Sequence, residues 1–181
     1  MIERIVRHPN VYERLVTDLC QGNQDYLDAV IKETLRLRPV LSIVARYVKK
    51  PITLNTMAVP SGVTLVPSIY LLHRRPDVYA DPDQFRPERF LDTTNQPHTW
   101  IPFVGGSRRC LGASFATAEM KTVLTALLTT QRVTTTRSDS PEPIKRRGLT
   151  HVPGRGAIVL LANEAHKPAS VPNNGTTRPA T

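Results

Sequence analysis

The sequence contains little cysteine and no long apolar run. Two cysteines, Cys20 and Cys110, occur in 181 residues, too few for a disulfide framework and without the paired Cys and His spacing of a structural zinc site. No stretch approaches the ~20 consecutive apolar residues that span a bilayer. The charged start MIERIVRHPN also lacks the apolar core of a signal peptide. These absences favour reduced thiols and a cytoplasmic protein. A Cys20–Cys110 disulfide, and membrane association through an anchor preceding Met1, are the alternatives.

Acidic residues are also scarce, because 15 Asp and Glu stand against 24 Lys and Arg, for a formal net charge of +9. Such an excess suits nucleic acid, an anionic surface or an acidic protein partner. Basic clusters such as Lys49-Lys50 and Lys145-Arg146-Arg147 make a nucleic-acid or anionic-surface binding protein one alternative function. No aromatic interleaving or recognition motif accompanies these clusters, so we expect no nucleic-acid partner.

The chain is long enough for one domain, and its pattern predicts a mainly α fold with small β-sheets. Apolar periodicity predicts helices over residues 11–19, 25–38 and 68–74, and a fourth after Cys110. Extended segments are predicted within 41–66 and 148–161, with hairpin turns at 60–62 and 153–156. The proline-rich stretch 75–103 is predicted to be an ordered meander, and residues 163–181 a disordered tail with few apolar side chains. The stripe expected to be buried on the fourth helix is Ala116, Met120, Val123, Leu124 and Leu127.

The stretch FVGGSRRCLG, residues 103–112, surrounds Cys110 with groups that favour a charged sulfur. A cysteine just before a helix lies near free N–H groups and the positive end of the helix dipole, and both stabilise thiolate over thiol. Arg108 and Arg109 act in the same direction. Glycines remove side chains around the sulfur, and Phe103 supplies an apolar wall. The pattern predicts a charged sulfur ligand that faces a spacious apolar cavity.

This stretch resembles the signature of the cytochrome P-450 superfamily, the haem-thiolate monooxygenases. The signature F-x-x-G-x-R-x-C-x-G is met by Phe103, Gly106, Arg108, Cys110 and Gly112. Two further landmarks follow the family's order: the E-x-x-R of Glu33 and Arg36, and the P-E-R-F of residues 87–90. The resemblance covers residues 1 to about 162. It therefore implies that residues 1–162 are the C-terminal haem-binding portion of a cytochrome P-450 domain, followed by the tail.

The resemblance also implies roles for individual residues. Cys110 corresponds to the axial ligand of the iron of haem b, and no other catalytic residue is expected in this portion. Arg108 and Arg46 correspond to partners of the haem propionates, while Phe103, Gly106 and Gly112 complete the cofactor-binding set. The segment 40–45 corresponds to a substrate-facing wall, as does the tip of the last hairpin.

A buried charge triad of Glu33, Arg36 and Arg89 is implied in the same way. Taken alone, Glu33 and Arg36 lie opposite the apolar stripe of their helix, which favours a solvated surface pair. Arg89 alone fits a solvent-exposed loop equally well. The resemblance therefore predicts that Glu33 and Arg36 are buried, whereas the helix pattern alone predicts that they are exposed.

The activity implied is insertion of one oxygen atom from O2 into a small apolar organic substrate. Electrons would come from a redox partner of the ferredoxin or flavin reductase type, and Arg108, Arg109 and Lys121 suit an acidic donor. Members of the family are much longer, and the part absent here is N-terminal. We therefore expect a truncated C-terminal fragment whose fold is incomplete without the N-terminal half. An inactive or vestigial fragment without haem is the alternative.

Two further residues carry specific expectations. Val104 follows the signature phenylalanine at a position where the family has glycine or another small residue, and a β-branched side chain there restricts the backbone of the loop. His73 lies in LLHRR with no second histidine or carboxylate at ligand spacing. It is expected to be a hydrogen-bonded histidine at a helix end rather than a metal ligand.

Overall fold

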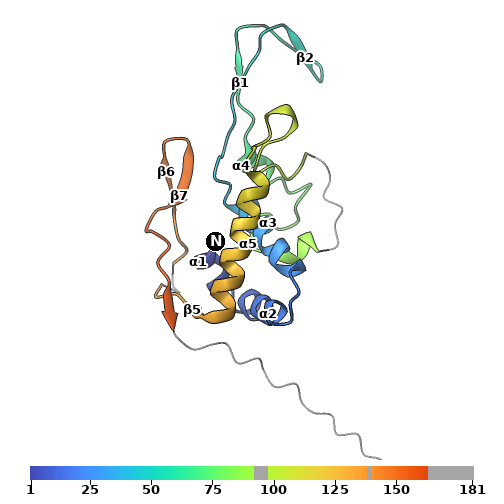
Figure 1. Cartoon of the computed structure of the whole chain (residues 1–181). Helices are drawn as coiled ribbons and strands as arrows, with labels where there is room; N and C mark the ends of the chain where they lie inside the picture. The colour runs from blue at the N-terminus through green and yellow to red at the C-terminus, as the bar shows by residue number, and fades with distance from the viewer. Residues whose placement is uncertain (92–97, 138–139, 163–181) are drawn as a thin grey trace, which may run out of the picture.

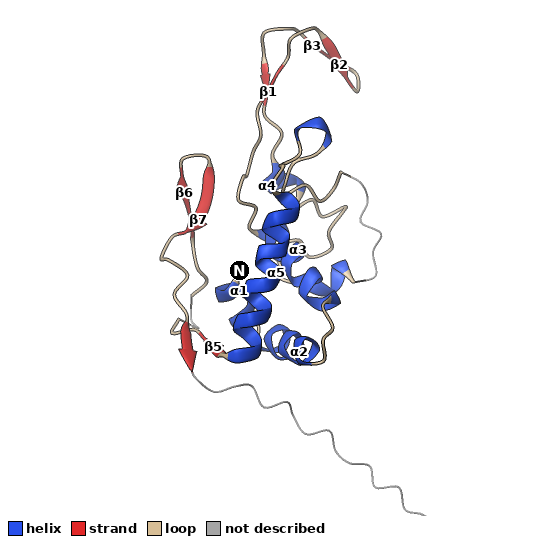
Figure 2. Cartoon of the chain, viewed as in Figure 1, coloured by secondary structure: helices blue, strands red, loops and turns tan. Residues whose placement is uncertain are grey.

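The computed structural model describes residues 1–91, 98–137 and 140–162. The helical elements, including two short 3-10 turns (η), are α1 (Ile2–Val6), α2 (Pro9–Cys20), α3 (Asp25–Leu37), α4 (Ile69–Leu72), η1 (Pro87–Phe90), η2 (Gly106–Arg108) and α5 (Ala113–Thr130). The strands are β1 (Arg46–Tyr47), β2 (Ile52–Leu54), β3 (Met57–Val59), β4 (Thr64–Leu65), β5 (Arg132–Thr134), β6 (Ile144–Arg147), β7 (Thr150–Pro153) and β8 (Leu160–Ala162). Figure 1 shows α5 along the helical body, with the β1–β4 segment projecting from one end and the β6–β7 hairpin at the side. The predicted class, mainly α with small sheets, is confirmed (Figure 2). The tail predicted for 163–181 lies outside the described residues.

Helix α2 begins at Pro9, two residues before the start of the helix predicted over 11–19. His8 is the N-cap, and proline suits the first helical position because its missing N–H has no partner there in any helix. Val11, Leu15 and Leu19 are buried as their four-residue spacing predicts. The α2 helix is therefore held by its apolar face, which packs against α1, α3 and α5.

Helix α3 is enclosed on more sides than its sequence pattern predicts. The apolar stripe that contains Leu27, Val30 and Ile31 is buried, but Glu33 and Arg36 on the opposite side are also 0% exposed. The opposite side is covered because α3 packs against η1 as well as against α2 and α5. The surface-pair interpretation of Glu33 and Arg36 is therefore wrong.

Helix α5 buries only part of its surface. Leu124 and Leu128 are fully buried, and Met120 and Leu127 pack at the edge of the core. Val123, predicted to be buried, is exposed, because no described element covers that side of the helix. In the part of the chain that the structure describes, no helix has both the length and the apolar character needed to cross a membrane.

The strands form four two-stranded antiparallel pairs among the described residues, and both predicted hairpin turns are wrong. Strand β3 pairs with β2 across a turn at Asn55, whose φ of 55° suits asparagine, whereas β4 pairs with β1. Pro60 follows β3 and has no N–H to continue a ladder. Strand β7 pairs with β6 through a turn at Gly148, where φ is 62°. The stretch 153–156 instead leads to β8, which pairs with β5.

Short bridges hold the segment 40–45 between the N-cap of α4 and the β6–β7 hairpin. Leu41 forms an isolated antiparallel bridge with Thr150, and Ile43 forms one with Ser68. The amide of His151 donates to the carbonyl of Val40 at 2.8 Å. The segment predicted to face substrate therefore lies beside the β6–β7 hairpin.

Candidate functional site

The loop that carries Cys110 is held by hydrogen bonds of its own backbone. The amide of Val104 donates to the carbonyl of Ile101 at 3.0 Å, which closes a tight turn. The amide of Cys110 donates to the carbonyl of Phe103 at 2.9 Å, so the chain returns to that turn after η2. The loop thus places Cys110 three residues before the start of α5.

The surroundings of Cys110 are open and apolar. Its thiol is free and exposed, and no atom lies within 4 Å of a Cβ placed on Gly106. The Leu111 side chain is completely uncovered and Phe115, on the first turn of α5, is 74% exposed. Large apolar side chains exposed together are typical of a surface that binds another group.

Val104 occupies a left-handed backbone conformation, with φ of 62°. A β-branched side chain rarely adopts such a conformation, and the cost is about 1–3 kcal/mol. The sequence predicts that Val104 restricts the backbone of the loop, and the positive φ shows that the strained residue lies in the tight turn. The turn retains this geometry because its two hydrogen bonds hold it on both sides.

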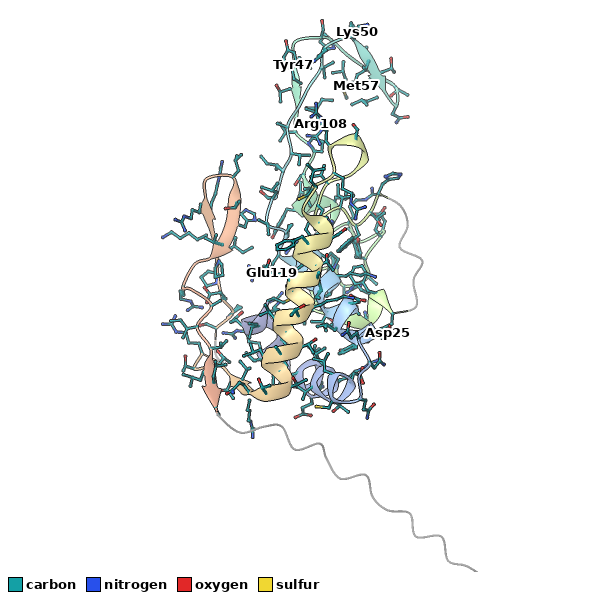
Figure 3. The ribbon with its side chains drawn as sticks, in the orientation of Figure 1. Asp25, Tyr47, Lys50, Met57, Arg108 and Glu119 are labelled. Carbon is teal, nitrogen blue, oxygen red and sulfur yellow. The ribbon has the colours of Figure 1, made fainter. Side chains whose placement is uncertain are left out.

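Arg46 in β1 and Arg108 in the loop have no acidic partner among the described residues. Arg46 in β1 donates only to the adjacent carbonyl of Ala45, at 2.9 Å, and Arg108 lies exposed in η2. Figure 3 places Arg108 between the projecting segment that bears Tyr47 and the end of α5. Both guanidinium groups are therefore free to bind an anion.

A buried ion cluster joins α3 to η1. Glu33 accepts two hydrogen bonds from Arg36, at 2.7 and 2.9 Å, and one from Nε of Arg89, at 3.1 Å. The amide of Arg86 donates to the same carboxylate at 2.9 Å. The three side chains that the family resemblance groups together are therefore in direct contact.

Arg36 uses its remaining donors on backbone carbonyls of other segments. Its Nη1 donates to His73 and to Pro82, both at 2.7 Å, and its Nη2 donates to Gln84 at 3.2 Å. Its guanidinium also lies over the ring of Tyr79 at 4.9 Å. A buried cation with this many partners fixes the meander against α3.

His73 connects the cluster to the loop. It is 0% exposed, Nδ1 lies 3.2 Å from the carbonyl oxygen of Arg36, and Nε2 accepts from the amide of Ile101 at 2.9 Å. Burial lowers the pKa of His73 from 6.5 to about 4; the Arg36 carbonyl opposes this shift, and the charges of Arg36 and Arg74 add to it. The histidine at the end of α4 is therefore hydrogen-bonded on both nitrogens, as expected.

Trp100 is a loop anchor that the sequence reasoning missed. Its Nε1 donates to the carbonyl of Lys32 at 3.0 Å, and its ring packs edge-on against Phe90 and Phe103, with centroids 6.2 and 6.5 Å apart. The sequence did offer a signal for this role, because Trp100 is the only tryptophan and lies three residues before the signature phenylalanine.

Lys121, predicted with Arg108 and Arg109 to bind an acidic partner protein, is already paired within the chain. Its Nζ lies 2.6 Å from a carboxylate oxygen of Asp28, so that α5 and α3 are joined by an ion pair. Arg108 and Arg109 remain exposed beside Cys110. The charge available at this face is therefore smaller than the sequence predicts.

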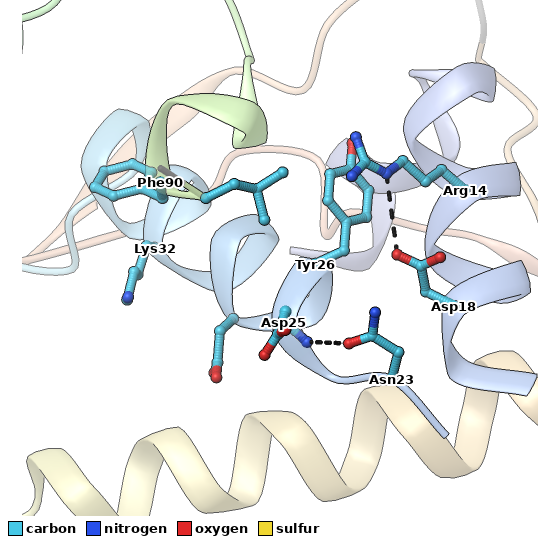
Figure 4. Close-up of a pocket in the computed structure, with 9 residues that line it drawn as sticks. Arg14, Asp18, Asn23, Asp25, Tyr26, Lys32 and Phe90 are labelled. Carbon is cyan, nitrogen blue, oxygen red and sulfur yellow. Dashed lines mark hydrogen bonds and ion pairs between the residues drawn. The ribbon is translucent and has the colours of Figure 1, made fainter. Parts of the chain in front are cut away.

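Two cavities among the described residues do not include Cys110 in their walls. One, of about 450 Å³, is polar and lies between α2, α3 and η1; Figure 4 shows Arg14 against the ring of Tyr26 in its wall. The other, of about 250 Å³, is lined mainly by apolar atoms, with Val40, Met120 and His151 among its residues. The second cavity includes one end of the segment predicted to face substrate.

Comparison with known proteins shows the family. The family model described as cytochrome P450 matches residues 4–160. The chain belongs to the cytochrome P450 family. A protein of Mycobacterium tuberculosis strain H37Rv, provisionally named cytochrome P450 135B1, is 40% identical over 166 residues, which are 88% of this chain and 35% of the relative. Another from the same strain, provisionally named cytochrome P450 137, is 41% identical over 155 residues, 86% of this chain and 32% of the relative.

A solved cytochrome P450 has the same arrangement. The structure described as retinoic acid bound cyanobacterial CYP120A1 matches with a TM-score of 0.80 at 28% identity. The match covers 88% of this chain and 40% of that one. The chain spans about a third of the length of the curated relatives. Its structure is therefore a partial cytochrome P450 fold, as the family resemblance predicts.

The residues around Cys110 fit the haem that the cytochrome P450 family implies. Haem iron takes its ligands from the porphyrin and from an axial side chain, for which a thiolate is one established choice. The loop offers an exposed thiol, uncovered apolar side chains beside it, and arginines without acidic partners. Within 1–91, 98–137 and 140–162, no three His, Cys, Asp or Glu side chains gather as a separate metal site.

Proposed function

We propose that this chain is the C-terminal haem-binding part of a cytochrome P450 monooxygenase, with Cys110 as the axial ligand of haem b. The observation that carries the proposal is an exposed thiol in a hydrogen-bonded loop at the start of α5, beside the uncovered Leu111 and Phe115. When bound, the haem would supply the oxygen chemistry that inserts one atom of O2 into an organic substrate. The domain would extend over residues 1–162.

The protein would hold the cofactor through a few distinct groups. Arg108 and Arg46 would pair with the two propionates, since both guanidinium groups are exposed and have no acidic partner in the described chain. Phe103 would form an apolar wall, and its position is fixed by the edge contact with Trp100. Gly106 and Gly112 would leave room for a flat group close to the backbone, because no side chain stands between the loop and the haem.

Segment 40–45 would supply part of the substrate wall. Its bridges to Ser68 and Thr150 hold the backbone in place, and Val40 borders the cavity of about 250 Å³. Val40 and Ile43 are exposed apolar side chains. A small apolar organic substrate would cover them, and its binding would displace water from the reacting position.

An electron donor would bind near the exposed side of the loop. Arg108 and Arg109 suit an acidic protein of the ferredoxin or flavin reductase type. Lys121 would contribute little, because Asp28 already neutralises it. The relatives are almost three times as long as the matched region. We therefore expect the chain by itself to ligate haem without oxidising substrate.

The deciding experiment is a spectrum of the ferrous–carbon monoxide complex. The chain is produced with a supply of haem, reduced and exposed to carbon monoxide. Thiolate ligation by Cys110 gives a strongly red-shifted Soret band, which Cys110→Ala abolishes. Cys20→Ala is the matched control and keeps the band, since Cys20 is the other free exposed cysteine and lies on α2. A red-shifted band that survives in Cys110→Ala contradicts the proposal.

A further inference from the structure

His73 and Arg36 are joined by hydrogen bonds in both directions. Nη1 of Arg36 donates to the carbonyl of His73 at 2.7 Å, and Nδ1 of His73 lies 3.2 Å from the carbonyl oxygen of Arg36. A carbonyl oxygen can only accept, so Nδ1 must carry the proton. The histidine is thereby fixed in one orientation against the buried ion cluster.

The other ring nitrogen holds the loop. The amide of Ile101 can only donate, so Nε2 accepts this bond, 2.9 Å long, with its lone pair. The carbonyl of Ile101 accepts from Val104, and the carbonyl of Phe103 accepts from Cys110. A continuous path of hydrogen bonds and short backbone steps therefore leads from the ion cluster through the imidazole to the peptide of Cys110.

Both bonds exist together only in the neutral imidazole. A second ring proton would place an N–H donor against the N–H of Ile101 and break the link to the loop. The charged groups around the ring oppose that proton: Arg36 and Arg74 are cationic, and the carboxylate of Glu33 is already bound by Arg36 and Arg89. The phenol of Tyr79 is occupied by the carbonyl of Thr99.

We propose that His73 is a positioning residue for Cys110, because it fixes the turn at Ile101, and with it the cysteine loop, to the buried cluster around Arg36. The proposal rests on the proposed function of Cys110 as the haem ligand. Trp100 is the second anchor of the same stretch, through its bond to the carbonyl of Lys32. The two anchors differ, since only His73 joins the loop to the ion cluster.

A pair of isosteric substitutions separates the two bonds of His73. In His73→Asn the amide group lies where Nδ1 was, so the bond to the Arg36 carbonyl is kept and the bond to Ile101 is lost. In His73→Gln the amide oxygen reaches the place of Nε2, so the bond to Ile101 is kept and the bond to Arg36 is lost. Each variant therefore loses one hydrogen bond, but only His73→Asn disconnects the loop.

The measurement is hydrogen exchange at the amides of Val104 and Cys110 in the full chain, compared at conditions of equal global stability. We expect exchange about tenfold faster in His73→Asn than in His73→Gln, the effect of losing one hydrogen bond. Buried amides of α3 serve as the internal reference and exchange equally in both variants. Equal loop exchange in the two variants means that Trp100 alone holds the loop, and overturns the proposal.

The haem-loaded chain gives a second, independent result. We expect the red-shifted Soret band of the carbon monoxide complex to weaken in His73→Asn and to persist in His73→Gln. If wild-type chain shows no thiolate ligation, the proposed function fails, and hydrogen exchange still decides whether His73 positions the loop. If ligation occurs and both variants keep the full band, the proposed effect of His73 on Cys110 is wrong.

Discussion

The ion cluster around Arg36 and the loop around Cys110 differ in the burial of their polar groups and in whether those groups have partners. In the cluster, Glu33 and Arg36 are completely buried, and each has several partners from this chain. In the loop, the thiol of Cys110 is exposed, and Arg108 and Arg109 have no acidic partner among the described residues. The cluster is complete within this chain, whereas the loop presents groups that only another molecule or a further part of the protein can satisfy.

This contrast separates residues that shape the fold from residues that bind. Removing one member of a satisfied buried cluster leaves charges unpaired, so stability falls steeply. Changing an exposed, unpartnered group has little effect on stability and acts on binding instead. Substitutions in the E-x-x-R motif are therefore expected to change stability, whereas substitutions in the signature around Cys110 are expected to change binding.

The largest expected effect on stability is in the cluster. Arg36→Leu removes the cation and leaves the buried carboxylate of Glu33 with fewer partners, so the free energy of unfolding should fall by about 3–5 kcal/mol. Urea unfolding measures the change. The matched control is Arg46→Leu at an exposed site, which should alter stability by less than about 0.5 kcal/mol. Similar losses for the two variants would remove the contrast between cluster and loop.

The next effect depends on pH and tests the link between the two regions. The pKa of His73 is about 4 in the folded chain and 6.5 in the unfolded reference. Between these values the unfolded state binds the proton and the folded state does not, so stability falls as pH decreases from 6.5 to 4. At pH 4.5 the loss should be about 2–3 kcal/mol. Unfolding of wild type and His73→Gln across this range isolates the contribution, which disappears in the variant.

Within the loop, a smaller gain is expected from Val104→Gly. Glycine adopts the φ of 62° without strain, so the variant should be about 1 kcal/mol more stable. The control is Val66→Gly, at an exposed loop position without positive φ, where the added freedom of the unfolded chain should lower stability. Thermal unfolding of both variants provides the comparison, and a loss of stability in Val104→Gly would show that the turn is not strained.

The smallest effect is expected at the ion pair between Lys121 and Asp28. Both side chains are partly exposed, and such pairs contribute about 0–1 kcal/mol. A double-mutant cycle with Lys121→Met and Asp28→Asn measures the coupling and should give a value within that range. A coupling as large as the loss in Arg36→Leu would place this pair with the buried cluster.

Sequence reasoning predicted the helical class and the site motif, because both depend on local patterns. The spacing in α2 is sufficient to identify its buried face, and the signature identifies Cys110. The burial of Arg36 could not be read from the helix alone, because its cover comes from Tyr79, Pro82 and Gln84, which lie more than forty residues away in the sequence. The strand pairing was missed for a related reason. Turn residues at 60–62 indicate a reversal of the chain, but the partner of β3 is decided by the Asn55 turn and by Pro60.

The projecting β1–β4 segment has a consequence for handling the isolated chain. The β1–β4 and β2–β3 sheets have two strands each, so the outer edge of every strand has no strand partner in the described residues. Tyr47, Leu54 and Met57 on these strands are exposed. Open edges of this kind recruit strands from other copies, and the neighbouring Lys49 and Lys50 oppose such contact by charge repulsion. Raising the salt concentration screens that repulsion, so concentrated samples should scatter more light in high salt than in low salt.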